Sequence, residues 1–130
     1  MMKFNTVGLF VTEMEKMVSF YRDVMDLETD WKGEANAELS CGEMRLIMYS
    51  RNDFEVMTGR KYSYTENING TMELAFDVPT FADVDKEYER VINAGAKPVF
   101  KPTTEPWGQR TCYVADPDGN LIEINSFCEK

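Results

Sequence analysis

The fold is decided by the stretch DPDGNLIEI, residues 116–124. Pro117 fixes φ for the second position of a turn and Gly119 tolerates positive φ, so the chain is predicted to reverse direction here. The reversal joins two strands expected at residues 110–115 and 121–127. This part of the chain is therefore predicted to be a β-hairpin.

Glu123 interrupts the apolar second strand of this hairpin with a charge. Because side chains alternate along a strand, Glu123 shares a face with Leu121 and Asn125, whereas Ile122 and Ile124 share the other. Most strand glutamates lie on a solvated face. The alternative is a carboxylate that points into a cleft, and the strand pattern alone leaves both open.

Outward from the hairpin, the same order of predicted elements occurs twice. Apolar periodicity predicts a strand, a helix and three strands in each half. The expected ranges are 4–11, 14–25, 29–31, 37–41 and 44–49, then 71–78, 81–92, 97–100, 110–115 and 121–127. Thr12 is expected to cap the first helix. When 67 is added to the residue numbers of the first half, its apolar residues align with apolar residues of the second half, for example Val7 with Leu74. We therefore predict a duplication.

The sequence WGQR at residues 107–110, then Tyr113, then DPDGNLIE at residues 116–123 resembles a known signature. It is similar to the C-terminal signature of the glyoxalase, bleomycin-resistance and extradiol-dioxygenase superfamily, also called the vicinal oxygen chelate fold. The resemblance extends over nearly the whole chain. It implies an α+β fold in which two βαβββ modules form a curved mixed sheet around a cleft.

The resemblance and the repeat together predict a single domain over residues 1–130, with modules 1–50 and 71–130. A loop at residues 51–70 is expected to join the modules. A connection of this length is either a flexible linker or a functional element, such as a lid or a dimer contact. The resemblance also implies a homodimer.

Composition limits the classes of function. A chain of 130 residues suits one core, and the formal charge of −9 disfavours nucleic acids and anionic membranes as partners. No apolar run is long enough to span a membrane and no apolar leader is seen, so we expect a cytoplasmic protein. The three cysteines lack metal-type spacing and are expected to be buried thiols. The absence of histidine removes the commonest metal ligand.

The resemblance also implies where a site lies. In metal-using relatives the glutamate matching Glu123 is a metal ligand, and the positions matching Thr6 and Glu73 usually hold histidine or another ligand. The fourth ligand belongs at or beside Ile47. This sequence offers only two carboxylates there, so we expect no cofactor, with a divalent metal on Glu73 and Glu123 as the alternative.

Without a cation between them, Glu73 and Glu123 are expected to repel, which raises the pKa of one or attracts a cationic ligand. The alternative is that Arg45 or Arg110 forms ion pairs with them. Trp107, in a loop bounded by proline and glycine, is expected to wall the pocket. The predicted ligand-binding set is Thr6, Ile47, Tyr49, Glu73, Trp107, Tyr113 and Glu123.

Three functions fit this sequence. The leading hypothesis is a metal-free binding protein for an amphipathic small molecule, which can be cationic, in an acidic cleft walled by aromatic rings. The second is a metal-dependent lyase or isomerase resembling glyoxalase I, with Glu123 and Glu73 as ligand and catalytic base. The third is a dimeric interaction domain without catalysis.

Overall fold

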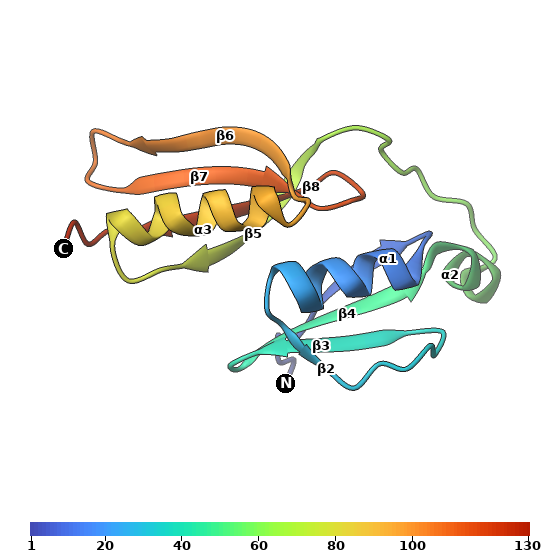
Figure 1. Cartoon of the computed structure of the whole chain (residues 1–130). Helices are drawn as coiled ribbons and strands as arrows, with labels where there is room; N and C mark the ends of the chain where they lie inside the picture. The colour runs from blue at the N-terminus through green and yellow to red at the C-terminus, as the bar shows by residue number, and fades with distance from the viewer. The chain divides into compact units, whose positions relative to one another are not determined.

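The computed structural model describes residues 1–130, which divide into two compact units, Met1–Tyr64 and Thr65–Lys130. Each unit contains one four-stranded mixed sheet with helical segments packed against it (Figure 1). The architecture is α+β with two repeated modules, as the sequence predicted. None of the helices combines the length and the apolar composition that crossing a lipid bilayer requires.

The first unit has the strand order β1-β4-β3-β2, in which β1 and β4 are parallel and the other pairs antiparallel. Its strands are β1 (Val7–Val11), β2 (Glu28–Thr29), β3 (Ala37–Cys41) and β4 (Met44–Ser50). Between β1 and β2, α1 (Met14–Ser19) continues into a π-helical segment, η1 (Phe20–Val24). The predicted cap at Thr12 is wrong, because Glu13 is the N-cap residue and its side chain makes no capping hydrogen bond.

The second unit repeats this arrangement with the strand order β5-β8-β7-β6, and β5 and β8 are parallel. Its elements are β5 (Asn69–Asp77), α3 (Phe81–Asn93), β6 (Lys97–Thr104), β7 (Arg110–Ala115) and β8 (Asn120–Ser126). A capping box starts α3, since Thr80 and Asp83 each bond the other's backbone N–H. The equal strand orders agree with the predicted duplication.

Period-two alternation divides the second sheet into an apolar and a polar face. Cys112, Val114, Ile122 and Ile124 are buried, and α3 packs against this sheet. Burial raises the pKa of the Cys112 thiol to about 12. Cys41 and Cys128 are exposed, so the expectation of three buried thiols is correct only for Cys112.

The predicted loop at residues 51–70 is wrong over its first part, where α2 (Arg51–Thr58) forms. The Ser50 side chain accepts a hydrogen bond from Asp53 N at 3.2 Å, and Gly59 ends the helix in the left-handed conformation. The segment after α2 then folds back onto Glu55. That carboxylate accepts bonds from Lys61 Nζ, the backbone N–H of Tyr62 and the Tyr64 hydroxyl, at 3.0–3.3 Å.

We expect Glu55→Gln to release the segment that follows α2, because the amide removes the charged acceptor of these three bonds. Trypsin cleavage after Arg60 and Lys61 should accelerate about threefold to tenfold, since proteolysis follows local opening. A time course read by mass spectrometry measures it. Glu66→Gln, an exposed change in the same connection, is the control, and equal rates in both variants would contradict the role of Glu55.

Candidate functional site

Two glutamates share the face of the second sheet that lies opposite its buried apolar side chains. In the β5–β8 register Glu73 is paired with Leu121, and Ala75 with Glu123. Since residues two apart on a strand share a face, the two carboxylates are diagonal neighbours. The strand pairing thus brings Glu73 and Glu123 together, as the sequence predicted.

Neutral donors surround this carboxylate pair. The Thr111 hydroxyl donates to Glu123 Oε2 at 2.6 Å, and Gln109 Nε2 donates to the same oxygen at 3.4 Å. The Tyr113 hydroxyl donates to Glu73 Oε1 at 3.4 Å. The pair is therefore held by hydrogen bonds that leave its charge uncompensated within this unit.

The surroundings of the pair change the pKa of Glu73 and of the neighbouring Tyr113. Partial removal from water, followed by the charge of Glu123, raises the pKa of Glu73 above the ordinary glutamate value. The pKa of Tyr113 is raised to about 12, first by burial and then by the two carboxylates. The sequence-based expectation of a raised pKa in the pair agrees with the structure.

The alternative, in which arginine forms ion pairs with Glu73 and Glu123, is wrong for Arg110. Arg110 instead forms a bidentate pair with Asp85 on α3, at 2.7 and 2.8 Å, which lowers the pKa of Asp85. In the first unit Arg45 donates to Glu38 at 2.6 Å and to Thr6 Oγ1 at 3.2 Å. Each arginine is already bound to another carboxylate.

Trp107 lies at the tip of the β6–β7 connection, where the backbone N–H of Gly108 bonds Glu105 O at 3.0 Å. Its side chain is 66% exposed, but its indole N–H donates to Gln109 Oε1 at 2.8 Å. The indole is a donor only, so this bond orients the Gln109 amide, whose Nε2 donates to Asn125 Oδ1 at 3.0 Å and to Glu123 Oε2 at 3.4 Å. Gln109 had no role assigned from the sequence, although it lies within the WGQR motif.

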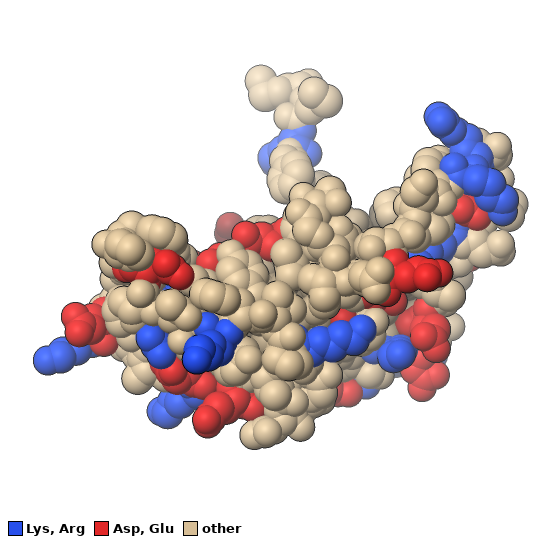
Figure 2. All heavy atoms as spheres, turned by 90° about the horizontal axis from the view of Figure 1, so that it is seen from above, with Lys and Arg blue, Asp and Glu red and all other residues tan.

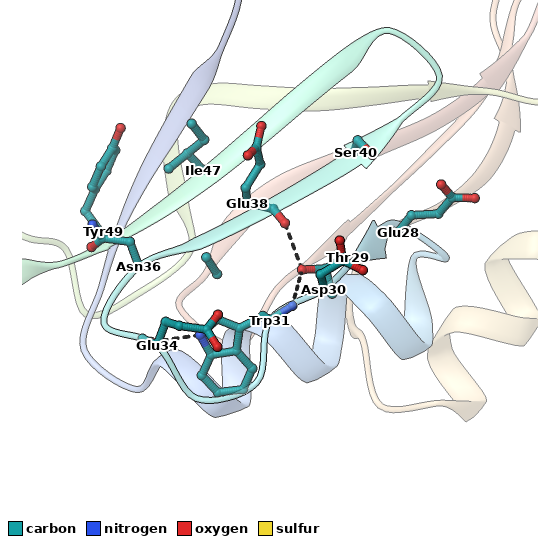
Figure 3. Close-up of a pocket in the computed structure, with 11 residues that line it drawn as sticks. Glu28, Thr29, Asp30, Trp31, Glu34, Asn36, Glu38, Ser40, Ile47 and Tyr49 are labelled. Atoms are coloured by element: carbon teal, nitrogen blue, oxygen red, sulfur yellow. Dashed lines mark hydrogen bonds between the residues drawn. The ribbon is translucent and has the colours of Figure 1, made fainter.

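The first unit contains a separate half-open pocket of about 660 Å³ (Figure 3). Trp31, Ile47 and Tyr49 form its apolar walls. The Trp31 indole N–H donates to the backbone oxygen of Glu34 at 2.8 Å, which fixes the ring on the connection between β2 and β3. Gly8 leaves room for the Tyr49 ring, because a Cβ there would lie 3.2 Å from Tyr49 Cε2.

The same pocket is acidic. No lysine or arginine lines it, and Arg45 neutralises only one of its four carboxylates. The four are Glu28, Asp30, Glu34 and Glu38. Figure 2 shows one face of the molecule, on which acidic and basic side chains are interspersed. The sequence reading missed this pocket, although the spacing of acidic residues around Trp31 was a visible signal.

The predicted ligand-binding residues fall into two groups. Ile47 and Tyr49 line the pocket of the first unit, and Thr6, just before β1, accepts the bond from Arg45. In the second unit Tyr113 is hydrogen-bonded to Glu73, and Gln109 is hydrogen-bonded to both Glu123 and Trp107. The assignment of these residues to ligand binding remains a prediction.

The donors at the family's metal positions do not suit a first-row transition metal. Thr6 Oγ1 faces a guanidinium group, and Ile47 has no donor atom. The structure contains no group of three or more His, Cys, Asp or Glu side chains arranged to hold a metal ion. Glu73 and Glu123 alone leave two carboxylates, fewer than the three or four donors of a lasting site.

Comparison of the chain with known proteins identifies relatives by sequence and by structure. The sequence model of the Glyoxalase/Bleomycin resistance protein/Dioxygenase superfamily matches residues 3–124. Over 127 residues the chain is 33% identical to the uncharacterized protein YraH of Bacillus subtilis (strain 168), covering 95% of this chain and 97% of YraH. Over 124 residues it is 31% identical to the metallothiol transferase FosB of Shouchella clausii (strain KSM-K16). This match covers 94% of this chain and 78% of FosB. Among solved structures, a glyoxalase/bleomycin resistance protein/dioxygenase family enzyme from Burkholderia phytofirmans PsJN matches with a TM-score of 0.82 and 25% sequence identity. This match covers 95% of this chain and 97% of that enzyme's chain.

We expect Glu73→Gln to stabilise the protein at neutral pH. A raised pKa means that the folded chain holds the Glu73 proton more tightly than the unfolded chain. The free energy of unfolding then falls as the pH rises from the unfolded to the folded pKa, and the loss is complete above that window. Because Glu73 is largely exposed, solvent screens the effect, and the melting temperature should rise by about 1–3 °C at about pH 8 and stay unchanged at about pH 3.5.

Thermal melts of wild type and variant across this pH range measure the difference. Glu89→Gln, an exposed change on α3, is the control and should have no such pH-dependent effect. A Glu73→Gln protein that melts at the wild-type temperature at about pH 8 would show that the combined effect of partial burial and of the charge of Glu123 does not raise the pKa of Glu73.

Proposed function

Because the chain belongs to the Glyoxalase/Bleomycin resistance protein/Dioxygenase superfamily, we propose that it binds an amphipathic organic cation, without a metal. The observation that carries this proposal is the acidic, aromatic-walled pocket of the first unit. Its volume of about 660 Å³ lies in the range of small-molecule sites, roughly 300–1,000 Å³.

The pocket matches an organic cation in two ways. The faces of Trp31 and Tyr49 can attract a cation through their ring quadrupoles, by about 0.5–1 kcal/mol at a solvent-accessible site. The carboxylates of Glu28 and Asp30 form no ion pair in the structure. A ligand with one flat apolar part and one positive charge would use both kinds of side chain.

The carboxylate pair of the second unit supports the same ligand charge. Glu73 and Glu123 repel each other and lack a basic partner, so a positive group beside them would relieve the repulsion. Trp107 is exposed and is linked to Glu123 through the Gln109 amide. Aromatic and acidic side chains are therefore combined in this unit as well.

A divalent-metal-dependent enzyme is the second candidate function, favoured by the similarity to a metallothiol transferase and by the paired carboxylates. Glu123 and Glu73 would be the metal-binding or catalytic residues of a transferase or of a glyoxalase I-like lyase. Calorimetric titration with Mn²⁺, Mg²⁺, Ni²⁺ and Zn²⁺, followed by thiol-transfer and hemithioacetal isomerase assays, tests it. Micromolar metal binding that both Glu73→Gln and Glu123→Gln abolish, together with turnover, would replace the binding proposal.

We expect the planar cation N-methylquinolinium to bind about tenfold more tightly than quinoline, its uncharged parent at about pH 8, since only the cation gains from the carboxylates. Calorimetry at low and high salt measures both affinities. The double substitution Glu28→Gln with Asp30→Asn should reduce this preference and its salt dependence, and Trp31→Leu should weaken both ligands.

Glu89→Gln is the matched control for loss of one negative charge outside the pocket. If Glu73→Gln or Glu123→Gln removes the preference and the pocket variants do not, the carboxylate pair of the second unit is the cation site. Equal binding of cation and parent in wild type would reject a cation-selective site.

A further inference from the structure

The helix α2 is held against the first unit by aromatic contacts and buries none of its residues. The Phe54 ring lies 4.4 Å from Phe10 and 5.2 Å from Tyr62, measured between ring centroids. Val56 and Met57 are 76% and 73% exposed. An amphipathic helix usually buries its apolar side chains, so the side chains left open on α2 require an explanation.

A groove of about 360 Å³ lies between α2 and the end of β4. It is lined by Asn36, Tyr49, Ser50, Asp53, Phe54 and Met57. Phe54, Tyr49 and Met57 give the groove an apolar surface with a flexible thioether, which adapts its shape to different hydrocarbon groups. Val56, the next residue to Met57 on the same helix, does not line the groove.

The groove adjoins the acidic pocket. Asn36 and Tyr49 line both spaces, and Figure 3 shows them at the end of the pocket away from Glu28. Tyr49 therefore borders both a space lined by carboxylates and a space lined by Phe54 and Met57. The two spaces have opposite chemical character and share a wall.

We propose that the groove is a second subsite, which takes the hydrocarbon tail of a ligand whose cationic head binds in the acidic pocket. The inference rests on the proposed function and names the ligand class more closely, as an organic cation that carries an alkyl chain. Charge complementarity selects the head at Glu28 and Asp30, and apolar burial on Phe54 and Met57 selects the tail. The helix that replaces part of the predicted loop then builds one wall of the binding site.

The experiment compares N-methyl-, N-butyl- and N-octylquinolinium below their micelle-forming concentrations, by calorimetry on the full chain. In wild type each added methylene should raise the affinity about twofold, because a half-open groove removes only part of each group from water. Met57→Ser should reduce this increment without changing the affinity for N-methylquinolinium. Circular dichroism verifies that each variant is folded.

Val56→Ser is the matched control, because it makes a closely similar polar change one residue away, at nearly the same exposure, outside the groove. It should keep the wild-type increment per methylene. An increment that is absent in wild type, or that Val56→Ser and Met57→Ser reduce equally, would overturn the subsite.

The head and tail proposals fail in different ways. If N-methylquinolinium binds and chain length has no effect, the cation site stands and the groove proposal is wrong. If only the long-chain compounds bind, and Met57→Ser weakens them, the groove holds the tail and the acidic head site is wrong. The other occupant that the groove could take is a second copy of the chain, which light scattering in the same buffers detects. Self-association that is lost in Met57→Ser would overturn the assignment of the groove to a small molecule.

Discussion

The buried carboxylate of Asp116 is the interaction on which the second unit depends. It is fully buried, and its Oδ1 accepts the backbone N–H of Asp118 at 2.9 Å and of Asn120 at 3.0 Å, while Oδ2 accepts Asn120 Nδ2 at 2.8 Å. These bonds fix the turn and therefore the register of β7 against β8. A slip of one residue would turn Glu123 to the apolar face and Ile122 or Ile124 to the polar one. The register also places Thr111 and Tyr113 on the face that carries Glu123.

Much of this arrangement could be predicted from the sequence, because it follows from local rules. Pro117 and Gly119 predicted the hairpin, and alternation predicted the face of Glu123. Alternation in the strand expected at residues 71–78 likewise separates Glu73 from Leu74, and the β5–β8 register places Glu73 on the face of Glu123. These conclusions need only the periods of strands and helices and the chemistry of turns.

The parts that could not be predicted depend on tertiary contacts. The helix α2 has a polar sequence and buries no residue, so periodicity gave little signal, although Ser50 and Gly59 are ordinary start and stop residues. Its one aromatic ring, Phe54, contacts Phe10 on β1 and Tyr62 in the following segment, and these partners are known only after folding. The partner of Arg110 was missed for the same reason, because α3 brings Asp85 to a strand 25 residues away. The pocket around Trp31 depends on β2, a strand of two residues that pattern reading places poorly.

The carboxylate pair of the second unit lacks a basic partner for reasons that the strand geometry explains. Arg45 and Arg110 are the cations that the sequence offered to Glu73 and Glu123, and each is engaged with another carboxylate. Arg110 alternates onto the face of β7 opposite Thr111 and Tyr113, where it binds Asp85 of α3 through two nitrogen atoms and not Glu123. The like charges of Glu73 and Glu123 oppose folding, and neutral donors from Thr111, Gln109 and Tyr113 hold them in place. Stability alone would favour neutralising the pair, and the retained repulsion is what the proposed binding of a cation would relieve.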